Sequence, residues 1–388
     1  MCIRDRSVAW GLNEDRQLGT GSTQFSSNVP APTSGLGFVT AVAAGGFHSL
    51  AVLADGTVRA WGGNEVGQLG DGEISPNSST PVTVSGLSNV TAVAAGRNFS
   101  LALLANGTVD SWGGNESGQL GDGTATQSDV PVAVKGLTGV RAIAAGGEHA
   151  LALLSNGTVE AWGANEFGQL GNGAILGSTS PVAVKGLSKV TAIAAGEAFS
   201  LAVLSGGSVE AWGENSSEQL GHKGVEEFSD VPILVEGVSG VTSVAAGAQH
   251  ALALLSGGTV AAWGAGADGQ LGDGATPPAS QTPVAVSNIS GVSAIAAGGF
   301  DSAALLSSGT IMTWGGDKYG TLGDATTGQN SDVPVAVAGL RKAAAISVGS
   351  AHMLAFGEAI PTVDRLEPPS GASTGGNTVV ITGTQLAG

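Results

Sequence analysis

One stretch decides the fold because it recurs along the whole chain: Ser100-Leu-Ala-Leu-Leu-Ala-Asn106-Gly107-Thr-Val-Asp-Ser-Trp112-Gly-Gly-Asn-Glu-Ser-Gly-Gln-Leu-Gly121. It holds two short apolar runs separated by Asn-Gly, the strongest short-range signal for a β-hairpin. In a two-residue turn of this type both central residues adopt a positive φ. A glycine-rich turn ending in Leu-Gly follows the tryptophan. The stretch therefore predicts two paired strands and a tight loop.

The repeat extends beyond this stretch. An apolar segment ending in Ala-Ala-Gly precedes each hairpin, as in Val90 to Gly96, and a Pro-Val-x-Val segment follows each loop, as in Pro81 to Val84. A four-stranded unit of this length is typical of a β-propeller blade, so we predict an all-β propeller with seven blades. Every tryptophan of the chain is followed by glycine, at intervals of 50 or 51 residues: Trp10, Trp61, Trp112, Trp162, Trp212, Trp263 and Trp314.

The small side chains of the Ala-Ala-Gly segment place it at the crowded axis, and the tryptophan strand is expected further out, between blades. The chain begins with a tryptophan strand, Ser7 to Trp10, and its last unit stops at His352 to Phe356 without one. These two ends are complementary. We therefore predict that the N-terminal strand completes the last blade and leaves no open sheet edge.

Composition excludes several classes of function. The 388 residues include 14 basic and 31 acidic ones, for a net charge of −17, which disfavours a nucleic-acid partner. No apolar run is long enough for a membrane span. Cys2 is the single cysteine, so neither a disulfide framework nor a thiolate metal site is expected. No nucleophile–base motif occurs, and we predict a protein without catalytic residues, cofactor or metal.

The run Ala-Gly-x-x-His-Ser/Ala-Leu-Ala-Leu, then Asp/Asn-Gly-Thr-Val, then Trp-Gly-x-Asn-x-x-Gly-Gln-Leu-Gly resembles the regulator of chromosome condensation repeat family. The Trp-Asp dipeptide of WD repeats and the repeated tyrosines of kelch units are missing. The resemblance implies a seven-bladed propeller, over residues 7–357. Residues 1–6 match no repeat and are expected to be a non-native leader. Residues 358–388 resemble the truncated start of an IPT/TIG immunoglobulin-like domain.

The turn after each Ala-Ala-Gly segment carries the candidate binding residues. Its third position forms a ring with one member per blade, for which a structural role is the favoured interpretation, and blade spacing argues against a shared metal site. The two positions before it vary, which is typical of recognition loops on a rigid scaffold. The longer loops, such as Gly19 to Pro32, are expected on the opposite face. The partner-binding candidates are Phe47, His48, Arg97, Asn98, Phe99, Glu148, His149, Glu197, Phe199, Gln249, His250, Phe300 and Asp301.

Three functions are compatible with these patterns. The favoured one is a non-catalytic propeller that binds a protein partner through loops on one face, in a bacterial secreted or cell-surface protein. The resemblance also implies two alternatives: a proteinaceous enzyme inhibitor of the β-lactamase-inhibitor type, or a guanine-nucleotide exchange factor. The acidic charge, the lack of a basic tail and the lack of a wedge-like insertion stand against exchange activity.

Overall fold

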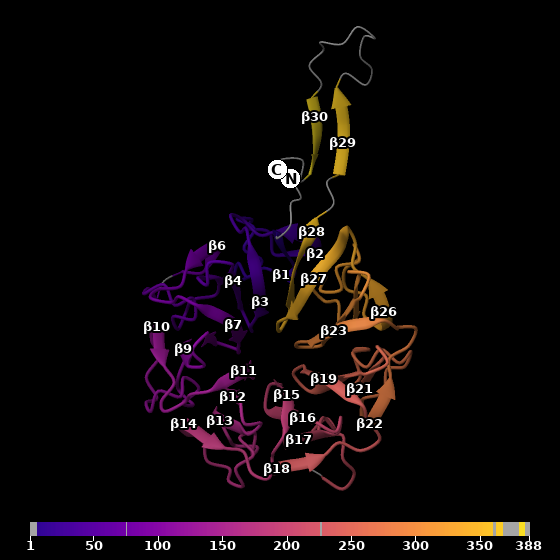
Figure 1. Ribbon diagram of the computed structural model, residues 1–388. Coiled ribbons are helices and arrows are strands. Elements are labelled where there is room, and N and C mark those ends of the chain that lie inside the picture. The colour runs from indigo at the N-terminus through magenta and orange to yellow at the C-terminus, as the bar shows by residue number, and fades with distance from the viewer. Residues whose placement is uncertain (1–5, 75, 226, 360–361, 368–379, 385–388) are drawn as a thin grey trace.

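The computed structural model describes residues 6–74, 76–225, 227–359, 362–367 and 380–384. Within these residues the chain forms seven four-stranded antiparallel sheets arranged around a central axis (Figure 1). The predicted seven-bladed all-β propeller is therefore confirmed. The first strand of each blade lies nearest the axis, where its alanines and glycines line a central cavity, as the sequence predicts.

Six blades are continuous in sequence, and each has its four strands in sequence order. Blades 1 to 3 comprise β3 (Val39–Ala44), β4 (His48–Leu53), β5 (Val58–Gly62), β6 (Ser78–Thr83); β7 (Val90–Ala95), β8 (Phe99–Leu104), β9 (Val109–Gly113), β10 (Ser128–Ala133); and β11 (Val140–Ala145), β12 (His149–Leu154), β13 (Val159–Gly163), β14 (Ser178–Ala183). Blades 4 to 6 comprise β15 (Val190–Ala195), β16 (Phe199–Leu204), β17 (Val209–Glu214), β18 (Phe228–Leu234); β19 (Val241–Ala246), β20 (His250–Leu255), β21 (Val260–Ala265), β22 (Ala279–Ala285); and β23 (Val292–Ala297), β24 (Asp301–Leu306), β25 (Ile311–Gly315), β26 (Ser331–Ala336).

Blade 7 joins the two ends of the propeller. It comprises β27 (Leu340–Val348), β28 (His352–Ala359), β1 (Arg6–Leu12) and β2 (Ser26–Pro32). The register of β1 on β28 pairs Ser7 with Phe356 and Trp10 with Met353. The predicted closure is confirmed, and β1 begins at Arg6, inside the segment expected to be a leader.

Little of the C-terminal segment is described. A separate antiparallel pair, β29 (Thr362–Glu367) and β30 (Val380–Thr384), follows the propeller. Residues 360–361, 368–379 and 385–388 lie outside the described residues, as do residues 1–5. The pair alone does not show an IPT/TIG domain.

The hairpin between the second and third strands differs from the expected two-residue turn. In blade 2, Gly107 has a φ of 79° whereas Asn106 does not have a positive φ. The Gly107 amide donates to the Leu104 carbonyl, and the Leu104 amide donates to the Thr108 carbonyl. This is a type I turn followed by a left-handed residue, which matches a three-residue loop with a bulge. The Asn106 side chain accepts from the Thr108 amide at 2.9 Å, which explains its place in the turn.

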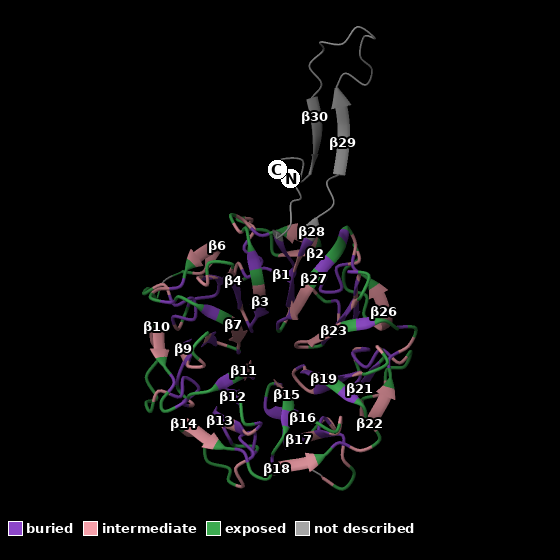
Figure 2. Ribbon diagram, in the orientation of Figure 1, coloured by how far each residue is buried: buried purple, intermediate pink, exposed green. Residues whose placement is uncertain are grey.

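Apolar packing runs between blades. Each tryptophan is fully buried and lies in a cluster shared with the neighbouring blade, and Figure 2 shows these buried segments inside the ring. Trp263 of blade 5, for example, packs with Phe199 and Leu201 of blade 4. Trp10 packs with Leu305 and Ile311 of blade 6, so blade 7 is joined to its neighbour in the same way.

A polar contact, which we call the inter-blade clasp, accompanies this packing. Between blades 1 and 2, the Gln68 backbone carbonyl accepts from the Trp112 indole at 2.9 Å and from the Ser100 hydroxyl at 3.0 Å. The Ser100 oxygen lies 2.8 Å from Nε2 of His48. Because the serine proton is used by the carbonyl, the histidine Nε2–H must be the donor to serine. Equivalent clasps use His149 with Ser200, His250 with Ser302, and His352 with Ser49.

Two blade pairs replace the polar half of the clasp with apolar contact. Phe99 lies in one core cluster with Ala150 of blade 3, and Phe199 lies in one with Ala251 of blade 5. The tryptophan hydrogen bond is kept in both pairs. A ring histidine is thus matched by serine in the next blade, and a ring phenylalanine by alanine. In each of the four histidine clasps the serine hydroxyl donates to a backbone carbonyl of the preceding blade.

Burial keeps the ring histidines neutral. Desolvation lowers the pKa of His48, His149 and His250 to about 4, against an ordinary value of 6.5. Desolvation, together with the charge of His48, lowers the pKa of His352 to about 3. The Nδ1 atoms of all four rings are buried without a hydrogen-bond partner among the described residues. Protonation therefore requires burial of an unpaired N–H and a charge.

Deletion of residues 1–12 should lower the melting temperature sharply. The deletion removes the third strand of blade 7 and leaves β2 and β28 without their shared partner. Calorimetry or circular dichroism on the two proteins measures the effect. Deletion of residues 1–5, which leaves β1 whole, is the matched control and should change the melting temperature little. Equal losses for both deletions would contradict closure through β1.

Stability should fall as the pH is lowered from about 6.5 to about 4. In this window the unfolded chain binds protons at its histidines, whereas the folded chain does not, because the folded pKa values are lowered. Buried carboxyls with raised pKa values, such as Asp301, act in the opposite direction. The double variant His149→Phe with Ser200→Ala, which copies the Phe99–Ala150 pair, isolates one histidine. Its melting temperature should depend less steeply on pH. If the pH dependence of its melting temperature were unchanged, the assignment of the effect to the buried histidines would be wrong.

Candidate interaction face

Two sets of connections share one face of the propeller. Because the strands of a blade are antiparallel and consecutive, the turn from first to second strand and the loop from third to fourth strand leave from the same end. The Ser117 hydroxyl of a third-to-fourth loop donates to the Glu148 carboxylate of a first-to-second turn at 2.8 Å. We call this the loop face, and the other end the hairpin face. The expectation that the long loops lie opposite the turns was wrong.

The structure divides the predicted site residues into buried and accessible ones. The ring members are buried: the histidines and phenylalanines make the inter-blade contacts described above, and Asp301 has a contact within its own blade. They offer a partner no surface, which is a correction to their place among the candidate binding residues. These buried members are His48, Phe99, His149, Phe199, His250 and Asp301. Asp301 accepts from the Thr321 hydroxyl within its own blade at 3.2 Å.

The remaining candidates reach the surface of the loop face. Arg97, Glu148, Glu197 and Phe300 are exposed. Phe47, Asn98 and Gln249 are half-buried. Sequence analysis missed further exposed groups here, among them Leu176 (79% exposed) and Phe167 (40%) in the third-to-fourth loop of blade 3. Repeat alignment could not find these two, because they lie where the units differ.

The turns of the loop face are held by a ring of backbone hydrogen bonds that runs through all seven blades. The amide after each inner-strand glycine donates to a carbonyl of the next blade, as in Arg97 to Gly147 at 3.1 Å and Ala248 to Gly298 at 2.9 Å. The ring closes where the Ser350 amide of blade 7 donates to the Gly45 carbonyl of blade 1 at 3.2 Å. The turns therefore present their side chains from fixed backbone positions.

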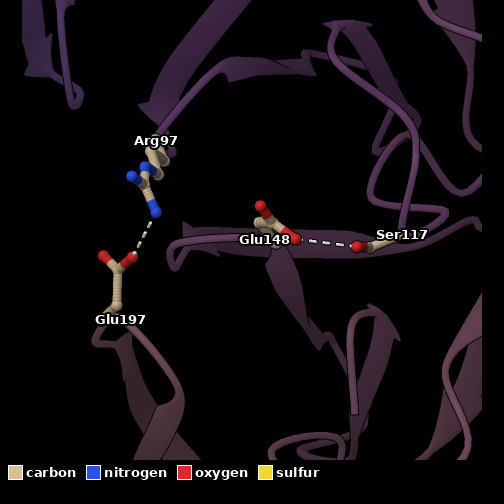
Figure 3. Close-up of polar contacts among 4 residues, drawn as sticks. All are labelled: Arg97, Ser117, Glu148 and Glu197. Carbon is tan, nitrogen blue, oxygen red and sulfur yellow. Dashed lines mark hydrogen bonds and ion pairs between the residues drawn. The ribbon is translucent and has the colours of Figure 1, made fainter. Parts of the chain in front are cut away.

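A central cavity opens between these turns. It has a volume of about 270 Å³ and is lined by the Ala-Ala-Gly strands of the seven blades. Arg97 and Glu197 are the charged residues of its lining, and they come from blades 2 and 4. Their side chains meet in an ion pair of 3.4 Å that passes over blade 3 (Figure 3). Both side chains are about half exposed, so the pair contributes only about 0–1 kcal/mol.

Gly147 of blade 3 makes room for this ion pair. A Cβ at this position would lie 2.8 Å from the Glu197 side-chain carboxyl carbon and 2.7 Å from its backbone carbonyl. Burial is the main cause that raises the pKa of Glu197, the Arg97 charge lowers it, and the charges of Glu148 and Glu214 raise it. The pKa of Glu197 is thus influenced by one guanidinium and by two other carboxylates.

Charge is distributed unequally between the two faces. The residue after the loop asparagine is an exposed glutamate in four units, Glu14, Glu65, Glu116 and Glu166. The first-to-second turns and the beginnings of the third-to-fourth loops carry the basic residues Arg16, Arg97 and Lys318. The connections of the hairpin face instead carry Lys135, Lys185, Lys189, Arg341 and Lys342. The four glutamates thus add negative charge to the loop face, and the five basic residues add positive charge to the hairpin face.

Within the described residues, no cluster of histidine, cysteine, aspartate or glutamate has the arrangement of a metal site. The same part of the chain contains no helix with the length and apolarity needed to cross a membrane.

Comparison with known proteins gives partial matches among curated sequences. The chain is 38% identical over 124 residues to human "Probable E3 ubiquitin-protein ligase HERC6", covering 31% of this chain and 12% of that protein. It is 34% identical over 143 residues to "Protein pim1" of fission yeast, covering 31% of this chain and 26% of that protein. The matched segments span 12% and 26% of these two relatives.

Solved structures match over nearly the whole propeller. Human WBSCR16 superposes with a TM-score of 0.83 at 25% identity, covering 92% of this chain and all of that one. Prp20p of Saccharomyces cerevisiae superposes with a TM-score of 0.82 at 24% identity, covering 93% of each chain, and shares the fold. The RCC1-like domain profile matches residues 6–355, the same span that forms the seven closed blades. The chain belongs to the RCC1-like domain family.

Proposed function

We propose that this chain is a non-catalytic interaction propeller that binds a protein partner through its loop face. The observation that carries the proposal is a set of exposed aromatic and charged side chains, including Phe300 at 55% exposure, on turns fixed by the closed ring of backbone hydrogen bonds. Rigid presentation lowers the entropy lost on binding, and exposed aromatic and arginine side chains are the types enriched in binding hot spots.

Absence of catalysis is part of the proposal. The four ring histidines are buried and used between blades, so none of them serves as a base for Ser117, whose hydroxyl donates to the Glu148 carboxylate. Ligase activity appears in the names of two HERC relatives, but the matches to them cover 12% and 9% of those proteins. Such activity is therefore not carried over to this chain.

A secreted or cell-surface location also belongs to the proposal. Its support is the resemblance of residues 358–388 to an IPT/TIG domain. The relatives named above are eukaryotic, and they lend no support to a bacterial source. Fractionation of the native source, with an antibody against the propeller, tests the location directly.

Two alternatives remain within the same family. An enzyme inhibitor would also use exposed loops of one face. Nucleotide exchange has a specific observation in its favour, since the study of the similar Prp20p structure names Gsp1p and histones as its binding partners. Against exchange stands the acidic loop face, and none of the described loops between strands forms a wedge-like insertion of its own strands.

Phe300→Ala should reduce binding of the native partner by roughly 1 kcal/mol or more if Phe300 is a hot spot. Affinity capture from surface or culture-supernatant proteins, quantified by mass spectrometry, compares the variant with wild type. Phe38→Ala is the matched control, because Phe38 is an exposed aromatic (71%) on the hairpin face. Captured proteins should be lost with the first variant and kept with the second. The reverse pattern would move the binding site to the hairpin face.

The propeller should not accelerate nucleotide release from a Ran-like GTPase. The measurement is fluorescent-nucleotide release at low micromolar propeller, with an authentic exchange factor as the positive control. Neither should it bind duplex DNA at physiological salt, because the net charge of −17 repels the phosphate backbone. Nucleotide release faster than the intrinsic rate would instead favour the function of a nucleotide exchange factor.

A further inference from the structure

The mouth of the central cavity has the features of a site for a cationic side chain. The cavity volume of about 270 Å³ is below the range typical of pockets for small-molecule ligands, but suits a single side chain. Its walls are mainly alanines and glycines, with Val42, Val93 and Val348, and they suit an aliphatic stem. Its charged groups stand only at the mouth, where Glu197 faces Arg97 at 3.4 Å.

The local charge favours a cation over an anion. Glu197 interacts electrostatically with Glu148 and Glu214 as well as with Arg97, so the carboxylates outnumber the guanidinium. Glu148 has a hydrogen bond from Ser117 that holds its carboxylate, and Figure 3 shows Glu148 and Glu197 on neighbouring turns. The exposed glutamates at the start of the surrounding loops extend this negative field outward, which attracts basic partners and repels acidic ones.

Arg97 already occupies the position at Glu197 that such a cation would take. The ion pair is longer than the 2.7–2.9 Å of a strong charge-assisted contact and is half exposed, so it is easily exchanged. Gly147 keeps the space beside Glu197 clear, because a Cβ there would collide with the carboxyl group. Arg97 is therefore a competitor that an incoming guanidinium can displace.

We propose that the mouth of the central cavity binds an arginine side chain of a basic protein segment, which displaces Arg97 from Glu197 and enters between the turns of blades 2 to 4. Arginine fits better than lysine, because its planar guanidinium can bind both oxygens of the Glu197 carboxylate at once. The exposed Phe300, Phe167 and Leu176 are apolar groups elsewhere on the loop face. The inference rests on the proposed function of the loop face and names the chemistry of the partner.

The test uses the whole chain and a fluorescein-labelled hexa-arginine peptide, with hexa-lysine and hexa-glutamate peptides for comparison. Fluorescence anisotropy at low and physiological salt gives the dissociation constants. We expect hexa-arginine to bind more tightly than hexa-lysine, hexa-glutamate not to bind, and the affinity to weaken with salt. Binding of hexa-glutamate, or no preference between arginine and lysine, overturns the proposal.

Matched variants separate this site from general attraction to an acidic protein. Glu197→Gln should weaken hexa-arginine binding about tenfold or more, as expected for loss of a charge-assisted contact. Glu160→Gln makes the same charge change at a half-buried carboxyl near the hairpin face, and should alter binding less than twofold. Equal losses for the two variants would mean non-specific attraction and overturn the proposal.

The variant Arg97→Ala should change the affinity for hexa-arginine in the opposite direction. Removal of the competitor should tighten hexa-arginine binding several-fold, whereas Arg59→Ala, at the hairpin end of blade 1, should change it little. Unchanged or weaker binding after Arg97→Ala contradicts displacement. If Phe300→Ala abolishes capture of the native partner while Glu197→Gln leaves peptide binding unchanged, the cation site fails and the loop-face function stands.

Discussion

The rest of the structure depends on one contact between neighbouring blades, in which a backbone carbonyl of one blade accepts two hydrogen bonds from the next. Gln68 of blade 1 receives the indole N–H of Trp112 and the hydroxyl of Ser100, both from blade 2. These donors are fully buried, and a buried donor without an acceptor is costly. A blade alone therefore leaves its tryptophan unsatisfied, and blades 1, 2, 4 and 6 would each leave a serine hydroxyl unsatisfied as well. Each blade therefore depends on the preceding blade for a hydrogen-bond acceptor, and every blade has one only when the ring is closed.

This dependence explains the split of blade 7 between the two ends of the chain. Trp10 of β1 donates to the Thr321 carbonyl of blade 6, and the Ser49 hydroxyl of blade 1 meets His352 of β28 and the Gln17 carbonyl that follows β1. The N-terminal strand thus takes part in both boundaries of blade 7. An open ring would lose polar contacts at two interfaces together with the apolar clusters around Trp10 and Trp61.

Adjacent residues of one turn have different roles: one is buried in the scaffold, and its neighbour is exposed on the surface. In the turn of blade 3, His149 is buried against Ser200 while Glu148, one residue earlier, is exposed beside the cavity mouth. Because the ring residue and the backbone hydrogen bonds fix the turn, its neighbouring positions can vary without loss of the fold. Arg97, Gly147, Glu197 and Ser350 occupy one equivalent position in four blades, yet differ in charge and size. Specificity at the mouth can change by substitution of residues that the scaffold does not use.

By itself the sequence determined the blade number, the strand order, the axial Ala-Ala-Gly strand and the closure, because these follow from repeat spacing and from two complementary ends. It also located the turn residues of the candidate site. Only the tertiary structure decided which of these are accessible: Phe99 and Phe300 are both aromatic turn residues, but one is buried between blades and the other is exposed. The meeting of Arg97 with Glu197, 100 residues apart, likewise depends on the angle between blades, since closing the ring brings turns of alternate blades together. The repeat sequence alone does not specify that curvature, because the curvature arises from the packing of one sheet on the next.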